Sequence, residues 1–439
     1  MTVVAAFPDG FLWGTASSSY QVEGNNRGSQ WWRFEQQPGA ITGDQRSRLA
    51  CDWWRDAEQD FDRMAELRLS ACRLSVEWSR VEPAPGRFDA AALDRYRQML
   101  AALHARGIVP WVALHHFSNP LWFEQAGGWE SSAAVERWLP YVHAVISALG
   151  DLCADWLTFN EPLVYLGQGW IRGRWPPRKQ SPRAALSVFR NLLKAHALAY
   201  HAIHDLCPSA HVGCAKALRM VQPLRASSPG DRFAAWLRRY LFDEFWLQAT
   251  TNGALYPPLG FGHGDALLRN TCDFLGINYY CRLWTRFSPD PRLLFGREQF
   301  KDNAETSDCG SRGPYSQYDP DGLRAICMDL RRYGKPIYVL ENGLPDADDD
   351  QRPRWLLAHL LSLHRAIRAG ADVRGYFHWT LVDNFEWDEG WNLRFGLFEL
   401  DPRTQQRRPR PSAALYRQIA ESNVITAALL EQVAPSLLA

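Results

Sequence analysis

The chain has 439 residues, with 49 Lys and Arg against 48 Asp and Glu, so its formal net charge is +1. This balance argues against a dedicated surface for nucleic acid or for an anionic membrane, because both need excess positive charge. Hydrophobic residues make up 46% and charged residues 22%, which is typical of a globular protein and excludes a largely disordered one.

Nine cysteines are spread along the chain without a C-x-x-C pair. An odd number at wide spacing is typical of reduced, buried thiols in a cytosolic protein. Residues 1–11 lack a basic segment followed by a long apolar run, so we expect no signal peptide. No apolar stretch approaches the ~18 residues that a spanning helix needs. We therefore expect a cytoplasmic protein without membrane insertion.

Eight short apolar segments recur along the chain and are predicted to be β-strands. Most are near-continuous apolar runs, which is typical of strands covered on both faces in a parallel sheet. In chain order they are residues 11–19, 71–78, 109–116, 156–161, 212–218, 274–280, 337–342 and 373–381.

Amphipathic segments lie between these strands and are predicted to be helices. The clearest are residues 56–67, 90–106, 321–333 and 354–369. A glycine follows the last three of them, as is common at helix ends. Strand and helix alternating eight times predict an α/β fold, a single (β/α)8 TIM barrel that forms one domain over residues 1–439.

The predicted strands are about 52 residues apart on average, well above the roughly 30 residues of a minimal βαβ unit. The surplus is expected in long loops after the strands, which would form a deep pocket at the carboxyl ends of the strands. Residues 287–320 are expected to be a surface loop and a candidate cover for that pocket. Residues 346–350 are an acidic turn, expected to be a solvated loop.

Two glutamates follow strands of the predicted barrel, each beside an asparagine. Glu161 ends the fourth strand in T-F-N-E-P, and Glu341 ends the seventh in V-L-E-N-G. A carboxylate after an apolar run is costly to bury without a partner or a chemical role. A structural ion pair would explain either one alone. The two together favour glycoside hydrolysis, which uses paired carboxylates.

Other polar and aromatic residues also lie at the predicted strand ends. Arg73, inside the second strand, needs a carboxylate partner, and a nucleophilic glutamate would supply one. His115 and His116 end the third strand. No further ligands occur at a compatible spacing, so contact with sugar hydroxyls is favoured over a metal site. The remaining candidates are Asn278, Tyr280, Trp379, Glu386 and Trp387.

Several of these segments resemble, in the same order, the signature motifs of glycoside hydrolase family 1. They are residues 7–17, 20–24, 158–162, 341–343, 383–387 and 394–397. A single tripeptide would be a weak signal, but the ordered set spans almost the whole chain and is highly specific. The resemblance implies a (β/α)8 barrel that acts as a retaining β-glycosidase on a small-molecule β-glycoside, without a cofactor or a metal.

The resemblance also assigns roles to individual residues. Glu161 would be the general acid/base and Glu341 the nucleophile. Arg73 and Tyr280 would hydrogen-bond the nucleophile, and Asn160 would hold the sugar 2-hydroxyl. The residues assigned to other sugar contacts or their support are Gln21, His116, Asn278, Trp379, Glu386 and Trp387.

Electrostatics agree with this division of roles. Arg73 is expected to lower the pKa of Glu341, because positive charge favours the carboxylate. Glu161 would face that anion in a pocket from which the substrate excludes water, so its pKa is expected to be raised. In a retaining enzyme the two carboxyl groups are expected ~5–5.5 Å apart.

The resemblance narrows the sugar and leaves the aglycone open. Family branches that act on 6-phosphorylated sugars lack the glutamate that is present here as Glu386. An unphosphorylated β-D-glucosyl substrate is therefore expected, with galactosyl or fucosyl as alternatives. An aromatic aglycone site and packing on the barrel exterior are equally good readings of Trp170, Trp175, Tyr240, Phe242 and Trp246.

Two other functions remain compatible with the barrel. A transglycosidase would pass the sugar to an alcohol with the same catalytic residues, so the sequence does not separate it from a hydrolase. A non-catalytic sugar-binding barrel would lack Glu161 or Glu341, and both are present, which disfavours it. The sequence does not indicate an oligomeric state.

Overall fold

Eight parallel strands form a closed barrel in the computed structural model, which describes residues 2–302, 304–307, 310 and 313–438. In chain order the strands are β2 (Leu12–Ala16), β3 (Ala71–Ser75), β4 (Val109–Ala113), β5 (Asp155–Asn160), β6 (His211–Ala217), β10 (Leu275–Asn278), β13 (Ile337–Asn342) and β14 (Val373–Trp379). Each overlaps one of the eight predicted segments. The predicted TIM-barrel fold is therefore confirmed.

The barrel closes where its last strand meets its first. β14 pairs with β2 in parallel from Gly375 opposite Leu12 to Trp379 opposite Ala16. A compact cluster of apolar side chains fills the inside, including Trp111, Phe274 and Phe377. A larger apolar cluster joins the strands to the helices. Both faces of the strands are thus covered, which explains their near-continuous apolar sequences.

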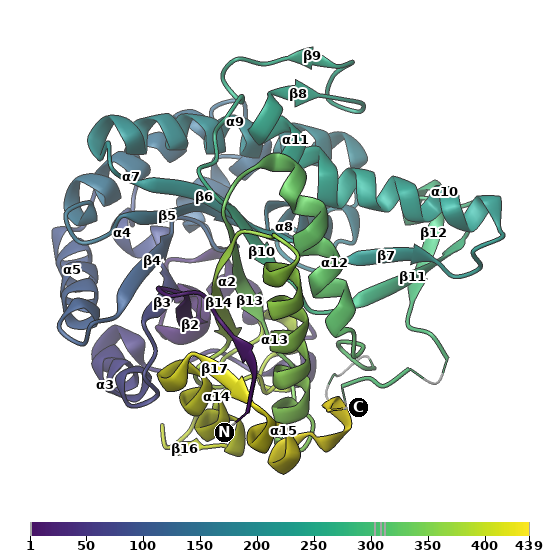
Figure 1. Cartoon of the computed structure of the whole chain (residues 1–439). Coiled ribbons are helices and arrows are strands. Elements are labelled where there is room, and N and C mark those ends of the chain that lie inside the picture. Colours follow the sequence, from purple (N-terminus) through teal and green to yellow (C-terminus); the bar gives the residue numbers. More distant parts are fainter. Residues whose placement is uncertain (1, 303, 308–309, 311–312, 439) are drawn as a thin grey trace.

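Helices surround the strands on the outside (Figure 1). The longer ones are α3 (Trp53–Glu66), α5 (Ala90–His104), α7 (Ala134–Leu149), α9 (Pro182–Leu206), α10 (Pro229–Arg238), α12 (Pro320–Leu330), α13 (Arg352–Arg368) and α14 (Pro411–Ser422). The four predicted helices correspond to α3, α5, α12 and α13. After α12, a 3₁₀ turn leads to Gly334, whose φ of 62° explains the glycine at this stop.

Shorter elements complete the chain. The short helices are α1 (Ser19–Val22), α2 (Gln30–Glu35), α4 (Trp78–Val81), α6 (Leu121–Gln125), α8 (Pro162–Leu166), α11 (Phe245–Asn252) and α15 (Ala427–Val433). The strands outside the barrel are β1 (Val3–Ala6), β7 (Met220–Pro223), β8 (Ala254–Leu255), β9 (His263–Gly264), β11 (Arg282–Phe287), β12 (Gly296–Gln299), β15 (Phe398–Leu400), β16 (Arg407–Pro409) and β17 (Val424–Thr426).

A three-stranded sheet stands beside the barrel and corrects one expectation. β11 pairs with β7 in parallel and with β12 in antiparallel orientation, next to α10 (Figure 1). Residues 287–320 are therefore not an irregular loop throughout, because they contain β12. Their expected position over the pocket is correct in part, since Glu298 and Tyr315 line it. Residues 303, 308, 309, 311 and 312 lie outside the described residues.

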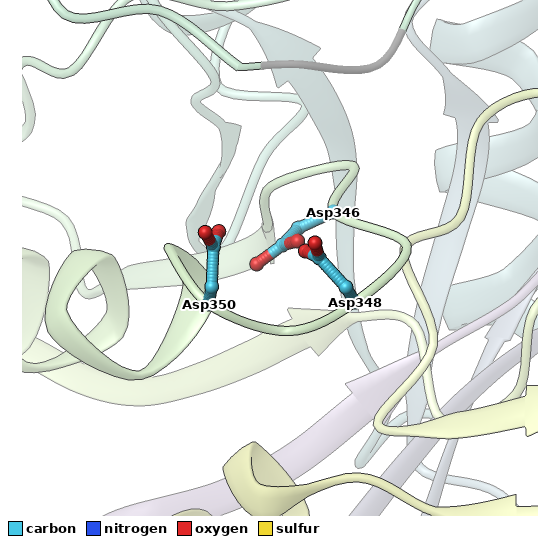
Figure 2. Close-up of side chains that lie close together, drawn as sticks. All are labelled: Asp346, Asp348 and Asp350. Atoms are coloured by element: carbon cyan, nitrogen blue, oxygen red, sulfur yellow. The ribbon is translucent and has the colours of Figure 1, made fainter.

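The acidic turn before α13 is largely structural. Three of its four carboxylates, at Asp346, Asp348 and Asp350, lie close together (Figure 2). Asp346 is fully buried and accepts the backbone N–H groups of Asp349, Gln351 and Arg352 at 2.8–3.0 Å. The expectation of a solvated loop is therefore wrong for Asp346, which accepts the N–H groups of Gln351 and Arg352 at the start of α13. It is also wrong for Asp349, which is buried and accepts from Ser412.

The two ends of the chain meet, because β1 pairs with β17 in antiparallel orientation. The eight cysteines that the structure describes are free, and Cys309 lies outside the described residues. Within the described ranges, none of the helices has the length and apolar character needed to cross a membrane.

Candidate active site

A pocket of about 510 Å³ opens at the carboxyl ends of the barrel strands. Its wall contains residues that end or follow β4, β5, β6, β10, β13 and β14. Nine of the predicted site residues lie on this wall, namely His116, Asn160, Glu161, Asn278, Tyr280, Glu341, Trp379, Glu386 and Trp387. Their position at the ends of the predicted strands therefore correctly indicated that these side chains meet at one cavity.

Glu341 is held from two sides at the end of β13. Arg73 Nη1 donates to Glu341 Oε1 at 2.5 Å, and the Tyr280 hydroxyl donates to Oε2 at 2.7 Å. Arg73 is fully buried within β3 and Glu341 is 4% exposed. These contacts fix the orientation of the Glu341 carboxylate, which lines the cavity.

Glu161 directly follows β5 and has an uncommon backbone conformation. Its φ of 44° is left-handed, and Pro162 begins α8 immediately after it. Non-glycine residues in this region are strained and persist where the surroundings enforce them, which is frequent at functional sites. The Glu161 N–H donates to Ala215 O at 2.7 Å, so β6 fixes this turn. The conformation directs the side chain to the pocket wall.

The amide of Asn278 joins the two carboxyl groups. Asn278 lies opposite Glu341 in the β10–β13 pairing. Its Nδ2 donates to Glu161 Oε1 at 2.9 Å and to Asn160 Oδ1 at 3.1 Å, and a hydrogen bond from Asn278 also lowers the pKa of Glu341. One side chain within reach of both carboxyl groups places them on facing sides of a narrow space.

Asn160 is fixed by a network of its own. Its Oδ1 accepts from Arg73 Nη2 at 2.6 Å, and its Nδ2 lies 2.9 Å from His116 Nε2. Burial and the nearby Arg73 charge lower the pKa of His116 well below its usual range, so the ring is neutral. A neutral imidazole can accept from one ring nitrogen, which suits the Asn160 N–H.

The two carboxyl groups differ in their electrostatics. Burial, and then the charge of Glu341, raise the pKa of Glu161 to about 7, in agreement with the sequence-based expectation. Burial also raises the pKa of Glu341, although Arg73 and Tyr280 act to lower it. The expected lowering at Glu341 is therefore wrong. Desolvation outweighs the arginine because the carboxyl lies deep in the barrel.

The predicted sugar-contact residues form one wall of the cavity. Trp379 ends β14, and its Nε1 donates to Glu386 Oε1 at 3.0 Å. The His116 ring stacks between Trp379 and Trp387, with centroid distances of 6.0 and 5.8 Å. Burial raises the pKa of Glu386 to about 8. Flat rings next to a hydrogen-bonding carboxyl suit a sugar ring with free hydroxyls.

Gln21 lies behind this wall. The side chain is fully buried and is absent from the described lining of the cavity. The Ser18 hydroxyl donates to Gln21 Oε1 at 2.7 Å, and Gln21 Nε2 donates to Asn384 Oδ1 at 3.0 Å. Gln21 also hydrogen-bonds Glu386 and lowers its pKa. The structure thus connects Gln21 to the wall through Glu386, and direct sugar contact stays a prediction.

The outer part of the pocket contains residues that sequence reasoning missed. Arg172, Arg219, Glu298 and Tyr315 all line it. Arg219 directly follows the predicted strand 212–218, so its position at a strand end could have identified it. Glu298 and Tyr315 lie in residues 287–320, which carry no such signal. Of the five aromatic aglycone candidates only Trp175 lines the described pocket, whereas Trp170 and Trp246 are buried elsewhere.

Comparison with known proteins shows which family has this sequence and this fold. The model of glycosyl hydrolase family 1 matches residues 3–425. The chain belongs to this family. It is thus a glycoside hydrolase, and the resemblance drawn from the ordered motifs is confirmed.

Characterised relatives of this family 1 chain align over nearly its whole length. A "Beta-galactosidase" from Sulfolobus acidocaldarius is 30% identical over an alignment of 483 positions that covers 96% of this chain and 96% of the relative. "Beta-glucosidase A" from Acetivibrio thermocellus is 30% identical over an alignment of 448 positions that covers 95% of this chain and 98% of the relative.

Solved structures of the family show the same fold. A beta-glycosidase from Pyrococcus horikoshii has a TM-score of 0.89 and 37% identity, with 99% of this chain and 98% of that chain covered. A beta-glucosidase from Thermotoga maritima in complex with glucoimidazole has a TM-score of 0.89 and 28% identity, with 96% and 100% covered.

Proposed function

We propose that this family 1 chain is a retaining β-glycosidase that uses Glu341 as nucleophile and Glu161 as general acid/base. The observation that carries the proposal is the different environment of the two carboxyl groups. Glu341 is held by a guanidinium and a phenol, which leaves it ready to attack. Glu161 accepts a hydrogen bond from a neutral amide and has a pKa of about 7, so it can carry the proton that the leaving group needs.

In the first step, a Glu341 oxygen attacks the anomeric carbon. The bond from that carbon to the glycosidic oxygen breaks, and Glu161 gives its proton to the departing oxygen. The sugar is then esterified to Glu341, and the aglycone leaves as an alcohol. Arg73 and Tyr280 hold the nucleophile in place, so the attack needs little reorganisation.

In the second step, Glu161 acts as the base. Esterification removes the negative charge of Glu341, which was one cause of the raised pKa of Glu161. The Glu161 pKa falls and the carboxyl stays ionised. It then takes a proton from water, whose oxygen attacks the anomeric carbon and displaces Glu341. Two inversions give a product with the original β configuration.

The proposed substrate has a terminal, non-reducing, unphosphorylated β-D-glucosyl group, with β-D-galactosyl and β-D-fucosyl as alternatives. Glu386, fixed by Trp379, offers a hydrogen-bonding carboxyl to a hydroxyl and no positive charge to a phosphate. The names of the relatives, a β-galactosidase and a β-glucosidase, support this range of sugars. A cytoplasmic location also stays a prediction, and the free cysteines support it.

The test is release of nitrophenol from 4-nitrophenyl β-D-glucoside by wild type and by Glu341→Gln. The matched control is Glu136→Gln, which makes the same change at an exposed position of α7. We expect the control to keep wild-type activity and Glu341→Gln to lose about 10⁴-fold. Activity retained in Glu341→Gln would contradict the nucleophile assignment. No release by wild type from this or other β-glycosides would contradict the proposed function.

A further inference from the structure

Three guanidinium groups surround one carboxylate in the outer pocket. Glu298, on β12, faces Arg172, Arg219 and Arg238. Three of these four residues line the cavity, and Arg238 supports the cluster from behind. The cluster therefore has more positive than negative charge on a surface that a ligand reaches.

Both oxygens of Glu298 are already engaged by two of the arginines. Arg172 Nη2 donates to Oε2 at 2.9 Å, and Arg238 Nη1 donates to Oε1 at 2.8 Å. Arg219 Nη1 is 4.0 Å from Oε2, which is beyond hydrogen-bond length. The Arg219 side chain is 35% exposed. Its N–H donors thus face the cavity without a carboxylate in hydrogen-bond range among the described residues.

Neighbouring charges do not remove the surplus. Lys216 donates to the Phe242 carbonyl, and the charges of Asp243 and of the proposed acid/base Glu161 both act on it. On the opposite side, Arg174 pairs with Asp388 at 2.8 Å and with Glu389 at 3.6 Å. Apart from Glu161, these neighbours add two cations and three carboxylates, so one of the two surplus positive charges around Glu298 remains. Packed guanidinium groups repel one another, which is unfavourable unless an anion joins them.

Arg219 lies on the leaving-group side of the reaction. It follows β6, whose Ala217 pairs with Asn278, the residue that hydrogen-bonds Glu161. The positive charge of Arg219 also acts on Glu161 and lowers its pKa. Since the proposed acid/base protonates the departing oxygen, a group beside it contacts the aglycone and not the sugar.

We propose that Arg219 binds a carboxylate on the aglycone, so that the enzyme prefers β-glucosides whose leaving group is an anionic carboxylic acid. The inference rests on the proposed function and adds the class of its leaving group. A guanidinium forms two parallel hydrogen bonds with a carboxylate, and such charge-assisted pairs are the strong ones. The partial burial of the site weakens screening by water and salt.

The test compares two glucosides that differ in charge and not in size, 4-carboxyphenyl and 4-carbamoylphenyl β-D-glucoside. We expect wild type to prefer the carboxylate by about tenfold in kcat/KM. Arg219→Gln should reduce this ratio to about one. The matched control is Arg374→Gln, which removes a positive charge at the exposed amino end of β14 and should leave the ratio unchanged.

A wild-type ratio of one or less, or an unchanged ratio in Arg219→Gln, would overturn the inference. A second measurement needs no variant. The wild type should be inhibited more strongly by 4-hydroxybenzoate than by 4-hydroxybenzamide, and equal inhibition would also overturn it. If wild type hydrolyses neither glucoside, the proposed function fails. Calorimetric binding of the two glucosides then decides the inference by itself, with equal affinity counting against it.

Discussion

At the scale of single residues, two glutamates have different proposed roles because their hydrogen-bond partners and neighbouring charges differ. Glu341 accepts hydrogen bonds from the guanidinium of Arg73 and the hydroxyl of Tyr280. Glu161 accepts one hydrogen bond from an amide and lies near the negative charge of Glu341. The positions of both were predictable, because a carboxylate after a buried strand is uncommon. The direction in which the Glu341 pKa is shifted was not predictable. The sequence indicates that an arginine is available as a partner, but it does not indicate how deeply the pair is buried.

The raised pKa of Glu161 leads to a prediction about pH dependence. Glu161 must be protonated to help the leaving group, and its pKa is about 7. Activity that needs the acid is therefore present below pH 7 and is lost as pH rises through that value. We expect kcat/KM for methyl β-D-glucoside to fall about tenfold per pH unit above about pH 7.

A second substrate serves as the control for this profile. 2,4-Dinitrophenyl β-D-glucoside has a leaving group that departs without a proton, so its kcat/KM should stay level from about pH 7 to 8. Rate against pH for both substrates makes the comparison. An equal alkaline fall for the two would assign that fall to a group other than the acid.

At the scale of elements, the sequence-based predictions were accurate wherever local pattern determines structure. Apolar runs and helix-stopping glycines located the eight barrel strands and four helices. The prediction failed at β12, because its residues form a strand only by pairing with β11, from Trp284–Gln299 to Phe287–Gly296. Glycine and charged residues carry little intrinsic strand preference, so this long-range pairing decides the conformation.

The start of α13 allows a prediction at this scale. Asp346→Ala removes the acceptor of three backbone N–H groups and should lower the free energy of unfolding by about 2 kcal/mol. Asp348→Ala, at an exposed position in the same turn, should change it by less than about 0.5 kcal/mol. Urea unfolding of the two variants measures the difference. Equal effects would show that Asp346 does not have this structural role.

At the scale of the whole molecule, the ends of the chain help to close the fold. β14 pairs with β2, and β1 pairs with β17. Trp13 Nε1 donates to Asn423 Oδ1 at 3.0 Å, which ties the first barrel strand to the residue after α14. These contacts join segments more than 350 residues apart. They could not be predicted from local patterns, although the (β/α)8 topology requires that the first and last strands meet.

One domain over the whole chain remains a proposal, and unfolding tests it. A barrel closed by its own ends cannot lose one part and keep the rest, so calorimetry should show a single thermal transition. Loss of glycosidase activity should follow the same curve. Two separate transitions, with activity surviving the first, would show that part of the chain folds independently of the barrel.

The measurement that tests the central claim most directly is trapping of the glycosyl-enzyme. 2,4-Dinitrophenyl 2-deoxy-2-fluoro-β-D-glucoside reacts in the first step, and its fluorine slows the second step by destabilising the cationic transition state. Mass spectrometry of the intact protein and of its peptides should find one fluoroglucosyl group per chain, on Glu341. No covalent adduct from a folded and otherwise active enzyme, or an adduct on another residue, would contradict the proposed mechanism.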